Sequence, residues 1–301
     1  MVTLALTVLT SSQGLLIAAS KANGVEYSYA VTSANCTVEF VKLIISFVAL
    51  VSVWSAEGVN PDNTLKSSFS ELAVYPIPAG LYLVKNLMQY YIFYWTDAPS
   101  YQILKNLNII STGILYRLFL QKPLTGVQWA ALALLGLGCA TAQLSTGTDS
   151  VLSTPVMGLL MAVVMAILSG AAGVYTELIM KTRPQRNINV QNVYLYAFGV
   201  LFNLGAIYFY DYDAVVGKGY FYGYSTLVYI MIANHALSGI AVSLVMKFAD
   251  NIVKVYSTSV AMILTTLVSI PLFGFELTLS FVLGTAVVCV ATYLHYQSKM
   301  K

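Results

Sequence analysis

Long apolar runs, separated by short polar stretches, fill almost all of this 301-residue chain. Hydrophobic residues make up 58% of the sequence and charged residues only 9%, whereas a soluble domain carries roughly 25% charged residues. A helix crosses a bilayer with about 20 apolar residues, and only helices satisfy every backbone group in lipid at these run lengths. The sequence therefore predicts an all-α membrane protein made of one transmembrane domain, residues 1–301, in contact with the lipid bilayer.

Ten of the apolar runs are predicted to be transmembrane helices. In order, they cover residues 2–19, 29–55, 69–94, 99–120, 125–144, 155–180, 190–210, 222–245, 252–273 and 277–296. With ten spans, both termini share a side with nine basic residues, while the opposite side has only Lys21 and Lys218. Because basic loops stay in the cytoplasm, we predict that both termini are cytoplasmic.

Two stretches of the chain, 97–143 and 250–296, align without a gap at a constant offset of 153 residues. The shared positions are Asp97 and Asp250, Ile110 and Ile263, Thr112 and Thr265, and the Leu-Thr pairs at 124–125 and 277–278. The offset pairs the last two spans of each half, and a unit of five spans must be inverted in its second copy. The sequence therefore predicts two inverted five-helix repeats, at about 1–147 and 153–301, an arrangement typical of secondary transporters.

A pair of opposite charges lies inside the second span. Glu39 and Lys42 are three residues apart, so they share one helix face. Each charge at a helix centre costs about 2.5–3.5 kcal/mol, which predicts a membrane-embedded ion pair. The pair either fixes helix packing alone or takes part in gating or substrate contact.

Three further lysines fall inside predicted spans: Lys85, Lys105 and Lys254. None has a carboxylate one helical turn away well inside its span, which favours an anionic ligand. Glu177 is a candidate partner for one of the intramembrane lysines, and the sequence does not decide which.

Amides and tyrosines recur at helical spacing beside these lysines. The stripes combine Tyr82, Asn86 and Gln89; Tyr101, Lys105, Asn108 and Thr112; Asn192, Tyr196 and Asn203; and Lys254 with Ser257. Tyrosine can stack on a base, amides and hydroxyls can hydrogen-bond its edge, and lysine can bind phosphate. The pattern predicts a binding cavity that suits a nucleotide.

Signatures of other function classes are missing from the sequence. No phosphate-binding glycine loop, nucleophile elbow or metal-ligand spacing is present, and no basic cluster suggests a nucleic-acid partner. His235 and His295 are isolated, which predicts packed or interfacial side chains. We therefore expect neither an enzyme nor a bound metal or cofactor.

Several motifs resemble those of a known family. They are DAPSYQ at 97–102, LFLQKPLTGVQW at 118–129, GAAGVYTE at 170–177, FYGY at 221–224 and KFADNIVK at 247–254. Together they resemble the nucleotide-sugar transporters of the Golgi, within the drug/metabolite transporter superfamily. The nearest branch carries CMP-sialic acid, UDP-galactose and UDP-N-acetylglucosamine, with CMP-sialic acid the best match.

The resemblance implies an antiporter in the Golgi membrane. It would exchange a nucleotide sugar for a nucleoside monophosphate, CMP or UMP, by alternating access. Tyr82 and Tyr101 would flank the base or ribose, Asn86 and Asn192 would hydrogen-bond the nucleoside, and Lys254 would face the phosphate or sugar acid. Tyr196 and Ser243 also match binding positions of the family.

One position departs from the family pattern. Animal members carry a lysine where this chain has Asn108, and Lys105, one turn away, is the candidate to supply that charge. Because of this departure, the resemblance does not identify which sugar the protein carries.

Three alternative functions remain at this stage. They are a UDP-galactose-type transporter, a proton-coupled exporter of small metabolites using Glu39 or Glu177, and a non-transporting membrane partner of glycosyltransferases. Small-residue faces in the fifth and tenth spans are compatible with a homodimer or with packing inside one bundle.

Overall fold

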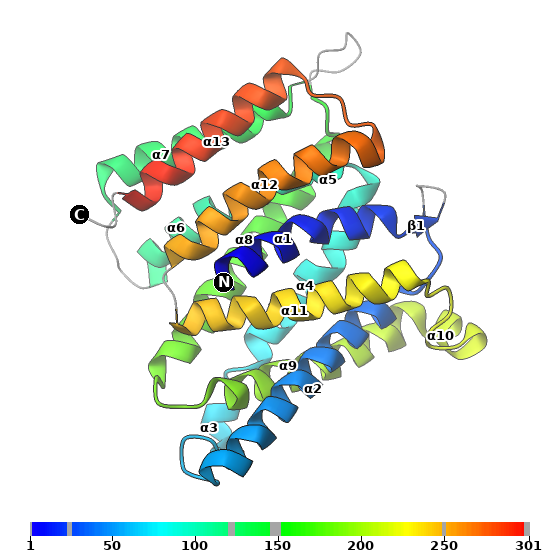
Figure 1. Cartoon of the computed structure of the whole chain (residues 1–301), viewed down its shortest axis with the longest axis vertical. Helices are drawn as coiled ribbons and strands as arrows, with labels where there is room; N and C mark the ends of the chain where they lie inside the picture. Colours follow the sequence, from blue (N-terminus) through cyan, green and yellow to red (C-terminus); the bar gives the residue numbers. More distant parts are fainter. Residues whose placement is uncertain (1, 23–25, 120–123, 145–151, 249–250, 298–301) are drawn as a thin grey trace.

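The computed structural model of the chain is an all-helical membrane protein, apart from one two-residue strand pair (Figure 1). The structure describes residues 2–22, 26–119, 124–144, 152–248 and 251–297. The first half contains α1 (Val2–Ala19), β1 (Lys21–Ala22), β2 (Glu26–Tyr27), α2 (Val31–Glu57), α3 (Phe69–Leu72), α4 (Pro76–Tyr91), η1 (Ile92–Tyr94), α5 (Ala98–Leu104), α6 (Leu107–Phe119) and α7 (Gly126–Ala142). The second half contains α8 (Val156–Thr182), α9 (Ile188–Ala206), η2 (Ile207–Asp211), α10 (Tyr212–Lys218), α11 (Thr226–Phe248), α12 (Asn251–Phe273) and α13 (Leu279–Gln297).

Every predicted span coincides with a helix or a run of helices. The agreement is closest at α1, which has the predicted bounds, and at α12, which ends at the predicted Phe273. In the described part of the chain, four helices are long and apolar enough to cross a membrane by length and composition: Val31–Glu57, Val156–Thr182, Ile188–Lys218 and Thr226–Lys247. Shorter apolar stretches lie in four further helices, at Ala5–Ala19, Gly126–Ala142, Val260–Phe273 and Leu279–His295.

The third and fourth spans are interrupted rather than continuous. In the third span, α3 ends before Pro76, which begins α4, because proline lacks the amide proton that a continuing helix needs. In the fourth span, Lys105 and Asn106 separate α5 from α6. The Asn106 side chain donates to the carbonyls of Gln102 and Ile103 at 3.1 and 3.2 Å, and such side-chain bonds compete with those of the helix.

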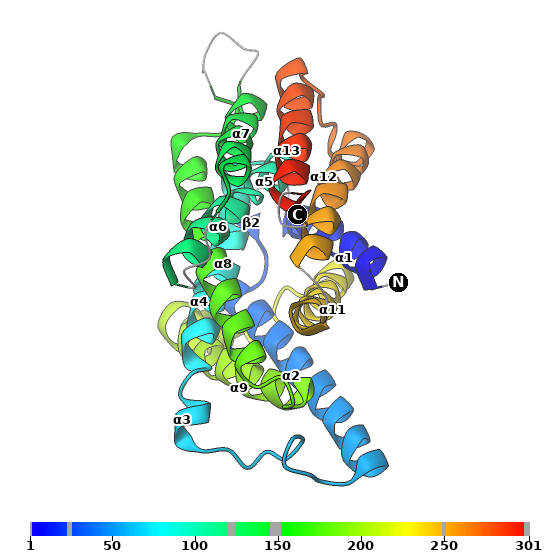
Figure 2. The ribbon, with the colours of Figure 1, turned by 90° about the vertical axis from the view of Figure 1, so that its left-hand side faces the viewer.

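The long helices form two groups that face each other. One group contains α4, α6, α7 and α8, and the other contains α1, α11, α12 and α13 (Figure 2). Helix α1 packs against α11 and α12, while α8 packs against α4 and α6. Helix α4 packs against α9, and α11 packs against α2. The remaining close pairs are α2 with α9, α5 with α12, and α7 with α13.

Two of these close pairs run antiparallel. Between α7 and α13, Gly138 lies against Val288, and Gly284 lies against Ala142. A Cβ on Gly284 would lie 2.4 Å from the Ala142 amide nitrogen, so glycine is required for this close approach. Between α2 and α9, Asn35 Nδ2 donates to Asn203 Oδ1 at 2.7 Å, and one turn further along α2, Glu39 lies against Gly199.

Matching hydroxyl caps begin α7 and α13. Thr125 Oγ1 accepts a hydrogen bond from the Gln128 amide at 3.3 Å, and Thr278 Oγ1 accepts one from the Phe281 amide at 3.1 Å. Such caps satisfy amide groups that the helix leaves without a partner. The Leu-Thr pairs that the offset of 153 aligns therefore have the same local role in both halves.

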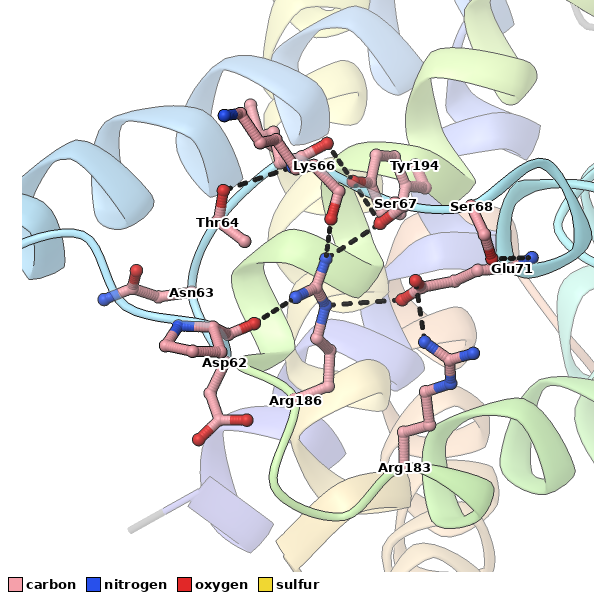
Figure 3. Close-up of polar contacts among 12 residues, drawn as sticks. Asp62, Asn63, Thr64, Lys66, Ser67, Ser68, Glu71, Arg183, Arg186 and Tyr194 are labelled. Carbon is pink, nitrogen blue, oxygen red and sulfur yellow. Dashed lines mark hydrogen bonds and ion pairs between the residues drawn. The ribbon is translucent and has the colours of Figure 1, made fainter.

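A polar network joins the α2–α4 connection to the α8–α9 connection (Figure 3). Glu71 pairs with Arg183 at 2.6 Å and with Arg186 at 3.4 Å. The Arg186 guanidinium also donates to the Pro61 carbonyl at 2.6 Å and to Ser67 Oγ at 2.8 Å. The network therefore holds a loop of the first half against a loop of the second at one end of the molecule.

Candidate binding cavity

A cavity of about 230 Å³, lined by many polar side chains, lies between the two helix groups. Its walls come from α1, α2, α4, α6, α8, α9 and α11, and from the α5–α6 junction. A single water needs about 10–15 Å³ measured in this way, so the space holds far more than an isolated buried water. The described residues of α7 and α13 do not line it.

The predicted ion pair lies in the cavity wall. Lys42 Nζ is 2.6 Å from Glu39 Oε1, and both side chains are at most 10% exposed. The Lys42 ammonium also lies 4.4 Å from the centre of the Tyr196 ring, a cation–π contact. Glycines make room for the pair, since a Cβ on Gly199 or Gly239 would come within 2.8 Å of Glu39 or Lys42, respectively.

Two further lysines line the same cavity. Lys85 Nζ donates to Gln89 Oε1 at 2.7 Å and to Asn86 Oδ1 at 3.3 Å. Lys105 Nζ donates to Gln13 Oε1 at 3.3 Å. Amide oxygens therefore orient the ammonium groups of these two partly buried lysines.

Glu177 lies at the cavity wall near the end of α8. Its Oε1 is 2.5 Å from Lys181 Nζ, and Tyr116 donates a hydrogen bond to its other oxygen. Glu177 thus forms an ion pair with the lysine one turn later on α8.

The structure brings most of the predicted binding residues together. Six of them line the cavity: Tyr82, Asn86, Lys105, Asn108, Tyr196 and Ser243. Asn192 is 2% exposed and lies behind Ser243, to which its Nδ2 donates at 3.0 Å.

Two predicted residues stand apart from this group. Tyr101 packs against Phe93, with ring centres 4.9 Å apart, and lines a small neighbouring cavity of about 20 Å³. Lys254 belongs to the first turn of α12, whose side chains from 251 to 259 lie outside the described residues.

Among the cavity residues that the sequence analysis did not assign to binding are Gln13, Asn35 and His235. Asn35 lies one turn before Glu39 on the same helix face, a signal that the sequence did contain. Gln13 enters from α1 through tertiary packing. His235 Nδ1 lies 2.9 Å from the Met231 carbonyl and its ring stacks on Tyr90, so the prediction of a merely packed or interfacial histidine missed its place in the cavity wall.

The side chains that line the cavity are of types that bind ligands. Ammonium groups, amides, hydroxyls and tyrosine rings can recognise an anionic, aromatic, hydroxyl-rich molecule through charge, stacking and hydrogen bonds. Within the described ranges, no group of three or more His, Cys, Asp or Glu side chains could hold a metal ion. An all-helical membrane protein with a polar cavity between two helix groups belongs, on these grounds, to the class of membrane transport proteins.

The chain belongs to the nucleotide-sugar transporter family, whose model matches residues 1–296. It is 63% identical over 298 residues to CMP-sialic acid transporter 2 of Oryza sativa subsp. japonica, covering 99% of this chain and 83% of that protein. It is 60% identical over 300 residues to CMP-sialic acid transporter 4 of Arabidopsis thaliana, covering 100% of this chain and 85% of that protein. A UDP-galactose/UDP-N-acetylglucosamine transporter of Caenorhabditis elegans is 31% identical, covering 96% of this chain and 80% of that protein.

The fold also resembles that of a solved crystal structure. The two chains superpose with a TM-score of 0.65 over 99% of this chain and 96% of the other, at 12% sequence identity. At that identity the likeness concerns the fold alone. The family assignment predicted from the motifs is thus confirmed by the family model and the plant relatives.

Proposed function

We propose that this transporter exchanges a cytosolic nucleotide sugar, CMP-sialic acid first among candidates, for a nucleoside monophosphate across the Golgi membrane. The observation that carries the proposal is the cavity, with its lysines, amides and tyrosines drawn from both halves of the chain. A nucleotide sugar and its monophosphate share the nucleoside and a phosphate, so one set of side chains would bind both. The plant relatives named as CMP-sialic acid transporters favour CMP.

The transport cycle we propose is alternating access by two inverted five-helix halves in a ten-span protein. Taking α1, α2, α4, α6 and α7 as counterparts of α8, α9, α11, α12 and α13, the packing of α1 on α11 and α12 corresponds to the packing of α8 on α4 and α6. The packing of α4 on α9 likewise corresponds to that of α11 on α2. The agreement between these helix pairs supports a two-fold relation between the halves.

The inversion has its own support. Helices exchanged by an axis in the membrane plane run antiparallel where they meet, whereas an axis along the membrane normal would leave them parallel. The α7–α13 and α2–α9 pairs are antiparallel. Related hydroxyl bonds also recur: Thr265 Oγ1 donates to the Ser11 carbonyl at 3.0 Å, and Ser111 Oγ donates to the Ala166 carbonyl at 2.6 Å.

Within this proposal the cavity residues have distinct roles. Tyr82 and Tyr196 offer ring faces to the base or ribose, with Asn86 and the Asn192–Ser243 pair for its polar edge. Tyr101 is proposed to contribute to substrate binding from the small neighbouring cavity. Lys105, close to Asn108, would bind phosphate together with Lys254. The Glu39–Lys42 ion pair would respond to whether cargo occupies the cavity. Both termini are proposed to be cytoplasmic, and a homodimer remains a proposal that the small-residue faces permit.

A UDP-sugar transporter is the second candidate, since relatives at 31–33% identity carry UDP-sugar names. A thermal-shift panel on purified protein with CMP, UMP, GMP and AMP separates the two. We expect CMP to raise the unfolding temperature most. A larger shift with UMP would favour the UDP-sugar assignment, and no shift with either pyrimidine nucleotide would contradict the nucleotide cavity.

A further inference from the structure

Gln89 of α4 is a side chain of the cavity wall with only one of its two amide atoms hydrogen-bonded among the described residues. It is 2% exposed and lines the cavity. Its Oε1 accepts from Lys85 Nζ at 2.7 Å. Its Nε2 has no hydrogen-bond partner among the residues that the structure describes.

The orientation of the Gln89 amide follows from its neighbour. An ammonium group only donates hydrogen bonds, so the amide atom next to Lys85 must be the carbonyl oxygen. The Nε2 group is then a buried donor, and a buried donor without an acceptor costs roughly 1–3 kcal/mol. The acceptor that would offset this cost has to be a group other than the described residues of the cavity wall.

The surroundings of Gln89 favour an anionic acceptor. Lys85 and Lys105 line both the main cavity and the small cavity beside it, so two ammonium groups share this part of the wall. The Gln89 carbonyl orients Lys85 while contributing no charge of its own. A glutamate at the same place would form an ion pair with Lys85 at i, i+4 spacing.

We infer that Gln89 and Lys85 form a phosphate subsite of the cavity. Gln89 holds the Lys85 ammonium in place through its carbonyl and donates through Nε2 to a phosphate oxygen of the cargo. A charged and a neutral donor side by side match an oxygen-rich anion better than a single point charge does. This inference rests on the proposed function, because it takes the cargo to be a nucleotide.

The test compares a nucleotide with its nucleoside on purified full-length protein. Binding of CMP, of cytidine and of CMP-sialic acid is measured by thermal shift and titration for the wild type, Gln89→Glu and Gln89→Met. We expect Gln89→Glu to weaken CMP binding at least tenfold and cytidine binding less than twofold, because only CMP carries the phosphate. Gln89→Met removes both hydrogen bonds without adding charge, and we expect a smaller loss, about three- to tenfold, again confined to CMP.

A matched control is Gln143→Met. Gln143 is also a buried glutamine, at 1% exposure, but it caps the end of α7 and does not line the cavity. CMP binding by this variant should equal that of the wild type. Retained cytidine binding by the Gln89 variants shows that they are folded.

Three results would overturn the inference. Unchanged CMP binding by Gln89→Glu would show that Gln89 is not part of a phosphate subsite. An equal loss of affinity for CMP and for cytidine would show that Gln89 only maintains the shape of the cavity. Weakened binding of CMP-sialic acid with unchanged binding of CMP would place the sugar carboxylate, rather than the phosphate, at Gln89. A wild type that binds neither CMP nor UMP would instead contradict the proposed function itself.

Discussion

At the scale of single residues, burial decides which charges matter. The two arginines that pair with Glu71 differ sharply in exposure, since the Arg183 side chain is 51% exposed and that of Arg186 only 8%. Exposed ion pairs contribute about 0–1 kcal/mol, whereas removing one partner of a buried pair costs about 3–5 kcal/mol because the other charge stays buried.

We therefore predict unequal effects of two matched substitutions. Arg186→Met leaves Glu71, itself 8% exposed, with a single exposed partner and also removes the bonds to Pro61 and Ser67. It should lower the free energy of unfolding by about 3 kcal/mol. Arg183→Met should lower it by less than about 1 kcal/mol. Thermal unfolding in detergent measures both, and equal shifts would contradict this account of the network in Figure 3.

Spacing within a single helix correctly indicated several residues that line the cavity. Glu39 and Lys42 pair as their spacing predicts, and Tyr82, Asn86 and Tyr196 all reach the cavity. The contribution of Gln13 depends on how α1 packs across the bundle, which spacing within one helix does not encode. Glu177 was predicted only as a candidate partner of an intramembrane lysine, and its ion pair with Lys181, one turn later on α8, was not predicted.

At the scale of helices, hydropathy predicted the approximate ends of apolar helices such as α1 and α12. It did not reveal the break between α5 and α6, because the run of apolar residues continues on both sides of it. The break depends on Asn106, whose side-chain amide donates hydrogen bonds to the helix carbonyls of Gln102 and Ile103. Its effect is to place Lys105 at a junction, with its ammonium close to Gln13 of α1.

The contact between α7 and α13 yields a prediction at this scale. A Cβ on Gly284 would lie 2.4 Å from the Ala142 backbone nitrogen and 2.6 Å from the Gly138 carbonyl. Backbone atoms of a neighbouring helix cannot move without shifting that helix, so Gly284→Ala should lower the unfolding temperature in detergent by an amount that reflects about 1–3 kcal/mol of overpacking.

Gly205→Ala provides the matched control. Gly205 also lies inside a long helix, but a Cβ there would meet no atom within 4 Å. Alanine is the better helix former, so this variant should be as stable as the wild type or slightly more stable. If Gly284→Ala proved equally stable, the close α7–α13 packing would be wrong.

At the scale of the whole molecule, α1 packs on α11 and α12 as α8 packs on α4 and α6. This correspondence and the matching caps at Thr125 and Thr278 support the two-fold repeat that we propose from the sequence. The sequence could not indicate which helices face each other across the cavity, because those contacts join residues far apart in the chain. The loop network of Figure 3 belongs to the same level, since it ties one half to the other.

The carboxylates of the cavity wall bear on the energy source for transport. Glu39 is paired with Lys42, and Glu177 with Lys181 and Tyr116. Each of these carboxylates therefore has a cationic partner within the protein. This arrangement agrees with the exchange that we propose, which needs no ion gradient.

The most direct measurement is uptake of radiolabelled CMP-sialic acid into proteoliposomes that contain the wild-type protein, either preloaded with CMP or empty. The account predicts that uptake into preloaded vesicles exceeds uptake into empty ones at least tenfold and is unaffected by an uncoupler. Equal uptake into loaded and empty vesicles, or uptake that an uncoupler abolishes, would contradict it.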